Sequence, residues 1–357
     1  MTETQHTLLL LLRIAIGTEA PCDLTARPCD WSALLAEATR QGVKGLVWSA
    51  IERLSGEGLV QLPMEAKMEW WGNVRATEQA LQGKFRQIAD FCSLMQPLQP
   101  IVLKGADYAR YWPSPLMREF GDLDCSFGGK EADADALACE RGCRREDGGY
   151  KHSHVFYKGL MIENHYAYVS FASSKGSRSL ERSLREFMAK GTTAIEGTGW
   201  LAPNADFTAL FMSAHACNHF FYEGIALRHI LDWLFFLEKE QASVDWEQVQ
   251  AAMETAGTSR FAEVLTGYCQ AYLGWVPRNK AIAASHDDAL LKAFGEDVFA
   301  VQRNPNDRRW HKMLSRLAHR FRRHYRFGTI ATASLPRAMW NALAYSSFLN
   351  RKPEFNT

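Results

Sequence analysis

The sequence lacks any apolar run long enough to cross a membrane. Its most apolar stretch, residues 8–16, is interrupted by Arg13 and is shorter than the roughly 18 to 20 residues that a membrane-spanning helix needs. The acidic Glu3 precedes this stretch where a secretory signal carries basic residues, and no small-residue cleavage site follows cleanly. We therefore expect no membrane partner and a cytoplasmic location.

The eight cysteines also lack CxxC pairs and zinc-finger spacing. A chain of 357 residues buries enough apolar surface to fold without disulfide staples. The cysteines are therefore expected to be reduced thiols.

A strong overall charge is absent as well. The formal net charge is +1, so nothing global favours a nucleic acid or an acidic substrate. The exception is local, because residues 303–326 contain nine lysines and arginines and one acidic residue. Apolar residues follow helical spacing there, which predicts a basic amphipathic helix. Two interpretations stay open: a surface for RNA or another polyanion, or a solvated helix that faces the acidic remainder of the chain.

Repeats and low-complexity tracts are absent, and three regions differ in their apolar periodicity. Residues 1–95 repeat apolar positions at three and four, as helices do. Short β-rich runs occur only between residues 97 and 168, and helical periodicity returns from about residue 178. We predict an α+β protein with a helical N-terminal region (1–95), a small mixed β-sheet core (96–175) and a helical C-terminal domain (176–357).

Two local signals organise the middle region. Lys158-Gly159 separates two alternating runs, and glycine supplies the positive φ of a tight hairpin turn. Residues 131–140 are alanine-rich and end shortly before Gly142, which predicts a crossover helix. The expected order is strand, helix and hairpin.

Asp122 and Asp124 are the strongest candidates for chemistry. Two residues apart on a strand, their carboxylates project from one face while Leu123 projects from the other. Two such charges repel unless a cation offsets them, and carboxylate oxygens suit Mg²⁺ or Mn²⁺. The alternative is a solvated strand end without a ligand.

The second strand of the hairpin supplies a third acidic residue. Glu163 and His165 share one face, whereas Leu160 and Ile162 face the other way and identify the core side. We expect Glu163 to join Asp122 and Asp124 as a metal ligand and His165 to lie beside it, although an exposed strand face shows the same alternation.

Lys104 and Gly105 lie where a strand leads directly into a helix. The N-terminus of a helix offers free N–H groups and a positive dipole end to a phosphate, and Lys104 adds a point charge. The alternative is a glycine turn beside a surface lysine.

His215 and His219 lie four residues apart in a helical stretch, so both imidazoles face one side. They lack the glutamate of an HExxH zinc protease, and packing, contact with a nucleotide and metal binding all stay open. Arg228 and Asp232 have the same spacing and predict an intrahelical ion pair.

Taken in order, these motifs resemble a bacterial family of uncharacterised nucleotidyltransferases within the polymerase-β-type superfamily. The similarity spans roughly residues 8 to 275 and rests on this series: Leu103-Lys104-Gly105, Tyr111-Trp112-Pro113, Arg118, Gly121-Asp122-Leu123-Asp124, Ile162-Glu163-Asn164-His165, His215, His219, Arg228 and Asp232.

The resemblance implies a mixed sheet in which Asp122, Asp124 and Glu163 hold the metal. It implies that Gly105 belongs to the phosphate-binding turn and that Arg118 neutralises phosphate or braces the aspartates. Ala106 departs from the Gly-Ser pair typical of the superfamily, so the hydroxyl contact to phosphate is missing and Lys104 is expected to compensate.

The function expected from these residues is metal-dependent transfer of a nucleoside monophosphate from a nucleoside triphosphate. The acceptor would be a hydroxyl or phosphate of a small molecule, an RNA or a protein, and the protein- or tRNA-modifying version would resemble a toxin. One alternative is a nucleotide-binding regulatory protein without transfer activity, which the Ala106 departure supports. Another is a metal-dependent hydrolase that uses His215 and His219.

Overall fold

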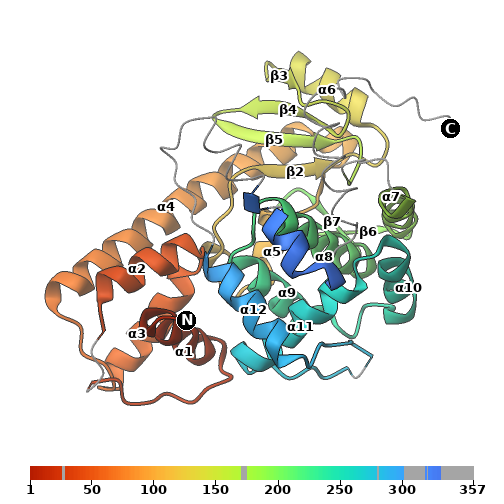
Figure 1. Cartoon of the computed structure of the whole chain (residues 1–357). Helices are drawn as coiled ribbons and strands as arrows, with labels where there is room; N and C mark the ends of the chain where they lie inside the picture. The colour runs from red at the N-terminus through yellow and green to blue at the C-terminus, as the bar shows by residue number, and fades with distance from the viewer. Residues whose placement is uncertain (26–28, 170–174, 280, 301–317, 320, 331–357) are drawn as a thin grey trace.

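A computed structural model describes residues 1–25, 29–169, 175–279, 281–300, 318–319 and 321–330. A seven-stranded mixed sheet has the order β3-β4-β5-β2-β1-β7-β6. Helices precede and follow it in the chain, so the predicted α+β class, with helical N- and C-terminal regions, is confirmed. In Figure 1 the strands β2 to β5 lie at the top, α1–α3 at the lower left and α8–α12 below the sheet.

The N-terminal region consists of α1 (Glu3–Ile16), α2 (Trp31–Arg40), α3 (Lys44–Gly56) and α4 (Met64–Leu94). The apolar run that follows Thr7 forms the buried side of α1, which begins with a capping box at Thr2 and ends at Gly17. The run therefore belongs to the core. The long α4 extends from α2 and α3 to the sheet (Figure 1).

Three neighbouring strands form the centre of the sheet: β1 (Ile101–Val102), β2 (Leu123–Ser126) and β5 (Leu160–His165). β2 runs antiparallel to β1 and parallel to β5. Between β1 and β2 lie the single-turn α5 (Ala106–Ala109) and the 3₁₀ turn η2 (Pro115–Met117), while η1 (Gln96–Leu98) precedes β1. The helix expected after Gly105 is thus only four residues long.

The predicted crossover helix and hairpin are confirmed. α6 (Glu131–Glu140) leads to β3 (Arg144–Asp147), and β4 (His152–Tyr157) pairs antiparallel with β3 and β5. Lys158 and Gly159 connect β4 to β5 with φ angles of 47° and 86°, the left-handed conformation that a tight hairpin turn requires.

The expectation that strands occur only between residues 97 and 168 is wrong. β6 (Thr192–Ala194) and β7 (Leu201–Pro203) extend the sheet, and β7 pairs in parallel with β1 through Ile101 and Leu201. Three residues are too few to show an alternation, and Pro203 ends the second strand.

Helices cover both faces of the central strands. On one face Leu123, Cys125 and Ile162 pack in a core cluster with residues of α4 and α6. Beyond the sheet follow α7 (Lys175–Ala189), α8 (Ala205–Tyr222), α9 (Leu227–Glu240), α10 (Trp246–Ala256), α11 (Ser259–Leu273), α12 (Asp288–Ala300) and η3 (Gly328–Ile330). None of the helices in the described ranges combines the length and apolarity needed to span a membrane.

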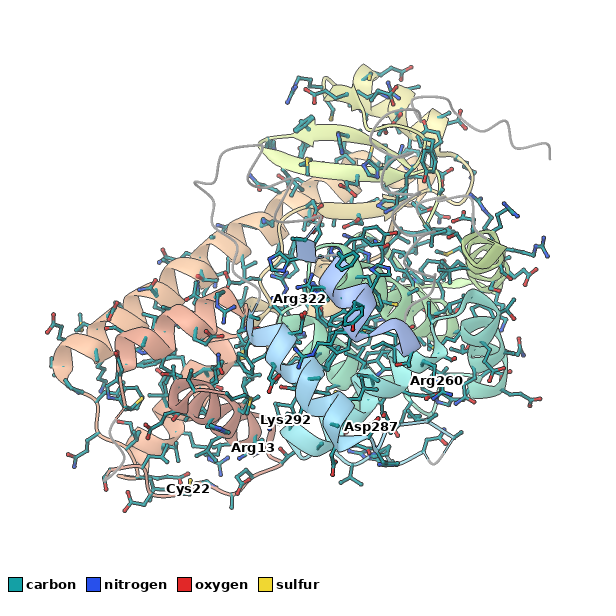
Figure 2. The ribbon with its side chains drawn as sticks, in the orientation of Figure 1. Arg13, Cys22, Arg260, Asp287, Lys292 and Arg322 are labelled. Carbon is teal, nitrogen blue, oxygen red and sulfur yellow. The ribbon has the colours of Figure 1, made fainter. Side chains whose placement is uncertain are left out.

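All eight cysteines are free, as the sequence predicts. Cys22 lies at the lower edge of the molecule in Figure 2, far from the sheet, and Cys125 is buried in β2.

Candidate active site

The pairing of three strands brings acidic and imidazole side chains together on one face of the sheet. Glu163 in β5 lies opposite Asp124 in β2 on one side and opposite His154 in β4 on the other. Two residues further along β5, His165 lies opposite His152 of β4. Residues opposite each other, or two apart along a strand, share a face. The sheet therefore presents five such side chains on the face away from Leu123 and Ile162.

Asp124 lies at the centre of this group and is 1% exposed. Its Oδ2 lies 2.9 Å from Nζ of Lys104, and its Oδ1 lies 2.9 Å from Nε2 of His165. Burial alone would raise the pKa of Asp124, but Lys104 and the hydrogen bond from His165 hold it well below the usual range. Asp124 is therefore a fixed negative charge at the base of the site.

The ring of His165 is oriented by a backbone carbonyl. Nδ1 lies 3.2 Å from the carbonyl oxygen of Ala167, an acceptor, so Nδ1 carries a proton. Nε2 then faces Oδ1 of Asp124 at 2.9 Å and Oε2 of Glu163 at 3.4 Å. A lone pair cannot face two carboxylates favourably, so Nε2 either carries a second proton or shares a cation with them.

Glu163 completes the acidic pair. Burial disfavours its charge, yet the hydrogen bond from His165 and the charges of His152 and His165 together outweigh that cost and lower the pKa of Glu163. One oxygen or nitrogen atom from each of Asp124, Glu163 and His165 lies within 4.8 Å of the others, close enough for a single ion. Asp122 is not a member of this group.

Asp122 lies just before β2, at the rim of the cleft described below. Burial and the neighbouring charge of Asp124 raise the pKa of Asp122, although the charge of Lys104 opposes them. Lys84 of α4 anchors the preceding loop by donating hydrogen bonds to the carbonyl oxygens of Phe120 and Gly121 at 2.6 and 2.8 Å.

Gly105 forms the turn that places Lys104 beside the aspartates. Its φ is +71°, and a Cβ at this position would lie 3.3 Å from the carbonyl oxygen of Asp122. The positive φ favours glycine, and a Cβ would also crowd the neighbouring carbonyl oxygen. Burial would lower the pKa of Lys104, but the charges of Asp124 and Asp122 raise it, so Lys104 is cationic. The ammonium of Lys104 faces Asp124.

Arg118 holds this turn in place through hydrogen bonds. Its Nη1 donates to the carbonyl oxygen of Gly105 at 3.2 Å, and its Nε and Nη2 each donate to an oxygen of Asp232 in α9 at 2.7 Å. The indole of Trp112 also donates to Asp232. The predicted ion pair between Arg228 and Asp232 is wrong, because Arg118 is the ion-pair partner of Asp232 and Arg228 donates to the carbonyl oxygen of Glu119.

A cleft opens between the sheet and α8 and α9. Lys104, Gly105 and Asp124 line it, with Asp122 at the rim, and α8 contributes His215 and His219 to its wall. The two imidazoles share a face as predicted, with ring centroids 4.3 Å apart. Burial and the nearby Lys104 hold the pKa of His215 well below its usual value, so this ring is neutral. Within the described ranges no third ligand completes a metal group with them.

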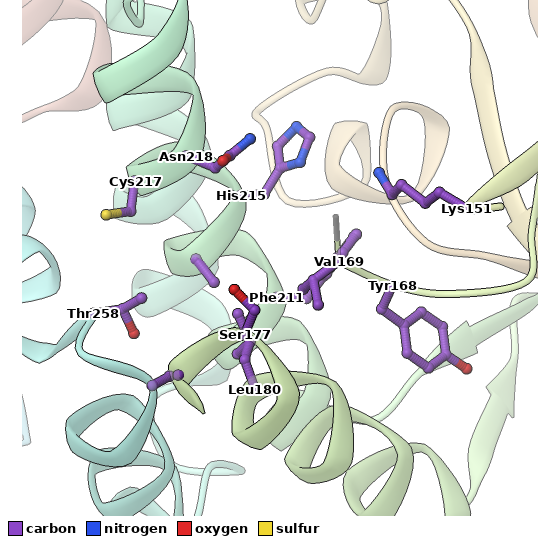
Figure 3. A pocket seen from close by; sticks show the side chains of 13 residues that line it. Lys151, Tyr168, Val169, Ser177, Leu180, Phe211, His215, Cys217, Asn218 and Thr258 are labelled. Atoms are coloured by element: carbon purple, nitrogen blue, oxygen red, sulfur yellow. The ribbon is translucent and has the colours of Figure 1, made fainter. Parts of the chain in front are cut away.

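A second cavity of about 100 Å³ shares His215 with the cleft. Lys151, Tyr168 and Asn218 are among the residues that line it. In Figure 3 the side chain of Lys151 extends toward His215 from the start of β4. Burial and the charge of Lys104 lower the pKa of Lys151, so its ammonium is destabilised.

Most of the basic segment 303–326 lies outside the described residues, including residues 303–317 and 320. The remainder contacts acidic residues of α12. Arg323 is 1% exposed and lies 2.7 Å from Asp297, while Arg326 lies 2.7 Å from Glu296. Arg322, labelled in Figure 2, approaches Asp297 at 3.9 Å. These described residues match the interpretation of a basic helix facing acidic groups.

No local motif of the sequence pointed to His152, His154 or Lys151. A signal was present, because a two-residue turn at Lys158-Gly159 sets which residues of the preceding strand lie opposite Glu163 and His165.

An acidic cluster beside a glycine turn and a cationic lysine is typical of proteins that handle polyphosphates. The chain belongs to the family described as uncharacterised nucleotidyltransferases, whose model matches residues 27–274. No curated protein and no solved structure matches the chain.

Proposed function

We propose that this protein transfers a nucleoside monophosphate from a nucleoside triphosphate to an acceptor, with Mg²⁺ or Mn²⁺ held at Asp124, Glu163 and His165. The observation that carries the proposal is that these three residues offer ligand atoms within 4.8 Å of one another beside Lys104 and Gly105. Membership of the nucleotidyltransferase family supports the reaction class.

The residues fit a divalent cation. Nε2 of His165 faces Oδ1 of Asp124 at 2.9 Å and Oε2 of Glu163 at 3.4 Å, so two carboxylate oxygens and one imidazole nitrogen converge on one point. A hydrogen bond from the other ring nitrogen to a backbone carbonyl, as Nδ1 makes to Ala167, is the usual second contact of a metal-bound histidine. Since imidazole is a softer ligand than carboxylate, this set favours Mn²⁺ over Mg²⁺. Asp122 would contribute through its charge at the rim.

A bound cation would neutralise the triphosphate and hold it against the sheet. Lys104 would place an ammonium against the phosphate oxygens, and Gly105 leaves the turn open to them. The acceptor oxygen attacks the α-phosphorus, the bond to the bridging oxygen breaks, and pyrophosphate leaves. Glu163, ionised because its pKa is lowered, receives the proton of the acceptor.

We assign the second cavity, behind His215, to part of the acceptor. It adjoins the cleft through a neutral imidazole and contains a destabilised lysine, a combination that suits a polar or anionic group. Whether the acceptor is a small molecule, an RNA or a protein decides how far it extends beyond this cavity.

The test incubates the full-length protein with each α-labelled nucleoside triphosphate and Mn²⁺ or Mg²⁺ in cell extract and identifies the labelled product. We expect label transfer and pyrophosphate release that Asp124→Asn abolishes. The matched control is Asp90→Asn, which removes an exposed carboxylate of α4 that pairs with Lys158 at the surface. Transfer by Asp124→Asn at the wild-type rate would refute the assignment.

The alternative is a regulatory protein that binds the nucleotide without transferring it. Ala106, which replaces the expected serine of the turn, favours this version. Triphosphate binding in a calorimeter, combined with no label transfer from any nucleotide, would support it. The hydrolase alternative based on His215 and His219 is weaker, because the described residues provide no third ligand there.

A further inference from the structure

A second group of potential ligands lies on the same face of the sheet, beyond Glu163. His152 and His154 of β4, together with Glu163, offer one ligand atom each within 4.8 Å of one another. Nδ1 of His152 lies 3.7 Å from one oxygen of Glu163, and Nε2 of His154 lies 3.9 Å from the other. We propose that His152, His154 and Glu163 form a separate, imidazole-rich site for a transition-metal ion of the Zn²⁺ and Co²⁺ type.

The spacing of the ligands suits such an ion. Zinc bonds of about 2.0 to 2.2 Å at tetrahedral angles place neighbouring ligand atoms about 3.4 Å apart. The observed separations of 3.7 and 3.9 Å, each to a different oxygen of Glu163, are a few tenths of an ångström longer, and the three ligand atoms all lie within 4.8 Å of one another. Two histidines and one carboxylate leave a fourth position for water or substrate, as in catalytic zinc sites.

The two rings are held in position and partly withdrawn from solvent. The exposed fractions of the His152 and His154 side chains are 17% and 26%, and their ring centroids lie 4.8 Å apart. Gly148, in the loop between β3 and β4, packs against His152 so closely that a Cβ there would lie 2.5 Å from its ring. Glycine thus lets the loop cover the imidazole.

One nitrogen of this site has no hydrogen-bond partner among the described residues. Nδ1 of His152 is buried, accepts and donates no hydrogen bond, and points at Glu163. A buried polar atom of this kind is usually satisfied by water, an ion or a ligand. A neutral imidazole is also the form that binds a metal.

The ligand chemistry separates this site from the one at Asp124. Two imidazoles and a carboxylate select zinc, cobalt or nickel, whereas Mg²⁺ prefers oxygen ligands alone. Glu163 belongs to both groups, with Oε2 near His165 and Oε1 near His154. A metal bound to the histidines would neutralise Glu163 and weaken its repulsion from Asp124, so the second site would organise the first.

The experiment titrates the metal-free protein with Co²⁺, recording the intense visible absorption band that four-coordinate Co²⁺ gives and the number of ions bound by calorimetry. We expect two ions on the wild type. His154→Gln and His152→Asn should each weaken the Co²⁺ that gives the band by about 100-fold or more, since even the loss of outer contacts to a metal ligand costs 10- to 100-fold. His6→Gln, at an exposed position in α1, is the matched control.

Asp124→Asn distinguishes this proposal from the proposed function, because it should abolish nucleotidyl transfer and the ion at Asp124 while the Co²⁺ band remains. A single ion on the wild type, lost in Asp124→Asn and unchanged in His154→Gln, would overturn the second site. So would two ions retained by both histidine variants. A wild type that gives no visible Co²⁺ band would overturn the second site even where a variant folds poorly.

Discussion

Replacing Asp124 by asparagine removes the negative charge that lies between Lys104 and His165. Asp124 is 1% exposed, and the Lys104 side chain is 17% exposed, so the pair is largely shielded from water. Removing one partner of a buried ion pair leaves the other charge uncompensated and typically costs about 3 to 5 kcal/mol. We therefore expect Asp124→Asn to lower the free energy of unfolding by about this amount in the absence of metal, besides abolishing transfer.

Asp122→Asn is the informative comparison, because the two aspartates have pKa shifts of opposite sign. Burial and the charge of Asp124 raise the pKa of Asp122, which means that its ionised form destabilises the folded protein at neutral pH. The neutral asparagine should therefore leave stability unchanged or raise it by less than about 1 kcal/mol. Activity should still fall steeply, since the rim charge is lost.

Urea unfolding of the two metal-free variants, followed by circular dichroism at pH 7, measures this difference. Pyrophosphate release with Mn²⁺ and a nucleoside triphosphate, recorded on the same preparations, measures activity. The reasoning is refuted if Asp122→Asn destabilises the protein as much as Asp124→Asn does. It is also refuted if Asp124→Asn is as stable as the wild type, because Lys104 would then not depend on this carboxylate.

Three further variants test the surroundings of the site. Gly105→Ala should lower the free energy of unfolding by about 1 to 2 kcal/mol and reduce turnover, because a φ of +71° is strained for alanine and the new Cβ would crowd Asp122. The control is Gly83→Ala in α4, where a Cβ meets no atom within 4 Å, so urea unfolding should show no loss of stability or a gain of up to about 1 kcal/mol. Arg118→Leu and Asp232→Leu should each lower the free energy of unfolding by about 3 to 5 kcal/mol, because each leaves a buried charge without its partner. The double variant should lose clearly less than the sum of the two losses, and additive losses in the same assay would contradict the buried pair. Burial raises the pKa of Asp107 to about 6 although Arg110 opposes it, so between about pH 4 and 6 the folded chain holds a proton that the unfolded chain releases. The free energy of unfolding should therefore fall by at most about 3 kcal/mol as the pH rises through this range. Urea midpoints measured across the range should show this slope for the wild type and a flatter one for Asp107→Asn.

The hairpin shows how much of the site can be predicted from sequence. Once Lys158-Gly159 is recognised as a two-residue turn, Tyr157 must lie opposite Leu160, and counting outward places His154 opposite Glu163. The same counting brings His152 to His165. The alternation of β5 alone identified Glu163 and His165, so the histidines of β4 were overlooked although their position follows from the same turn.

Other features depend on contacts that no local pattern records. β7 joins the sheet beside β1, a partner one hundred positions away, and its three residues show no alternation. Asp232 has a helix neighbour at the ideal spacing, Arg228, but pairs with Arg118 from another part of the chain. An exposed i,i+4 pair contributes only a few tenths of a kcal/mol, so a buried bidentate contact readily displaces it.

The contact between Arg118 and Asp232 also bears on the division of the chain into regions. Arg118 belongs to the segment between β1 and β2 and holds the carbonyl oxygen of Gly105, yet both of its remaining hydrogen bonds go to α9. The wall of the cleft comes from α8. Residues 96–175 therefore contain the acidic groups but neither the brace of the glycine turn nor the opposite wall. Since β7 also supplies a neighbour for β1, we expect the sheet to need the residues that follow 175 in order to bind a nucleotide.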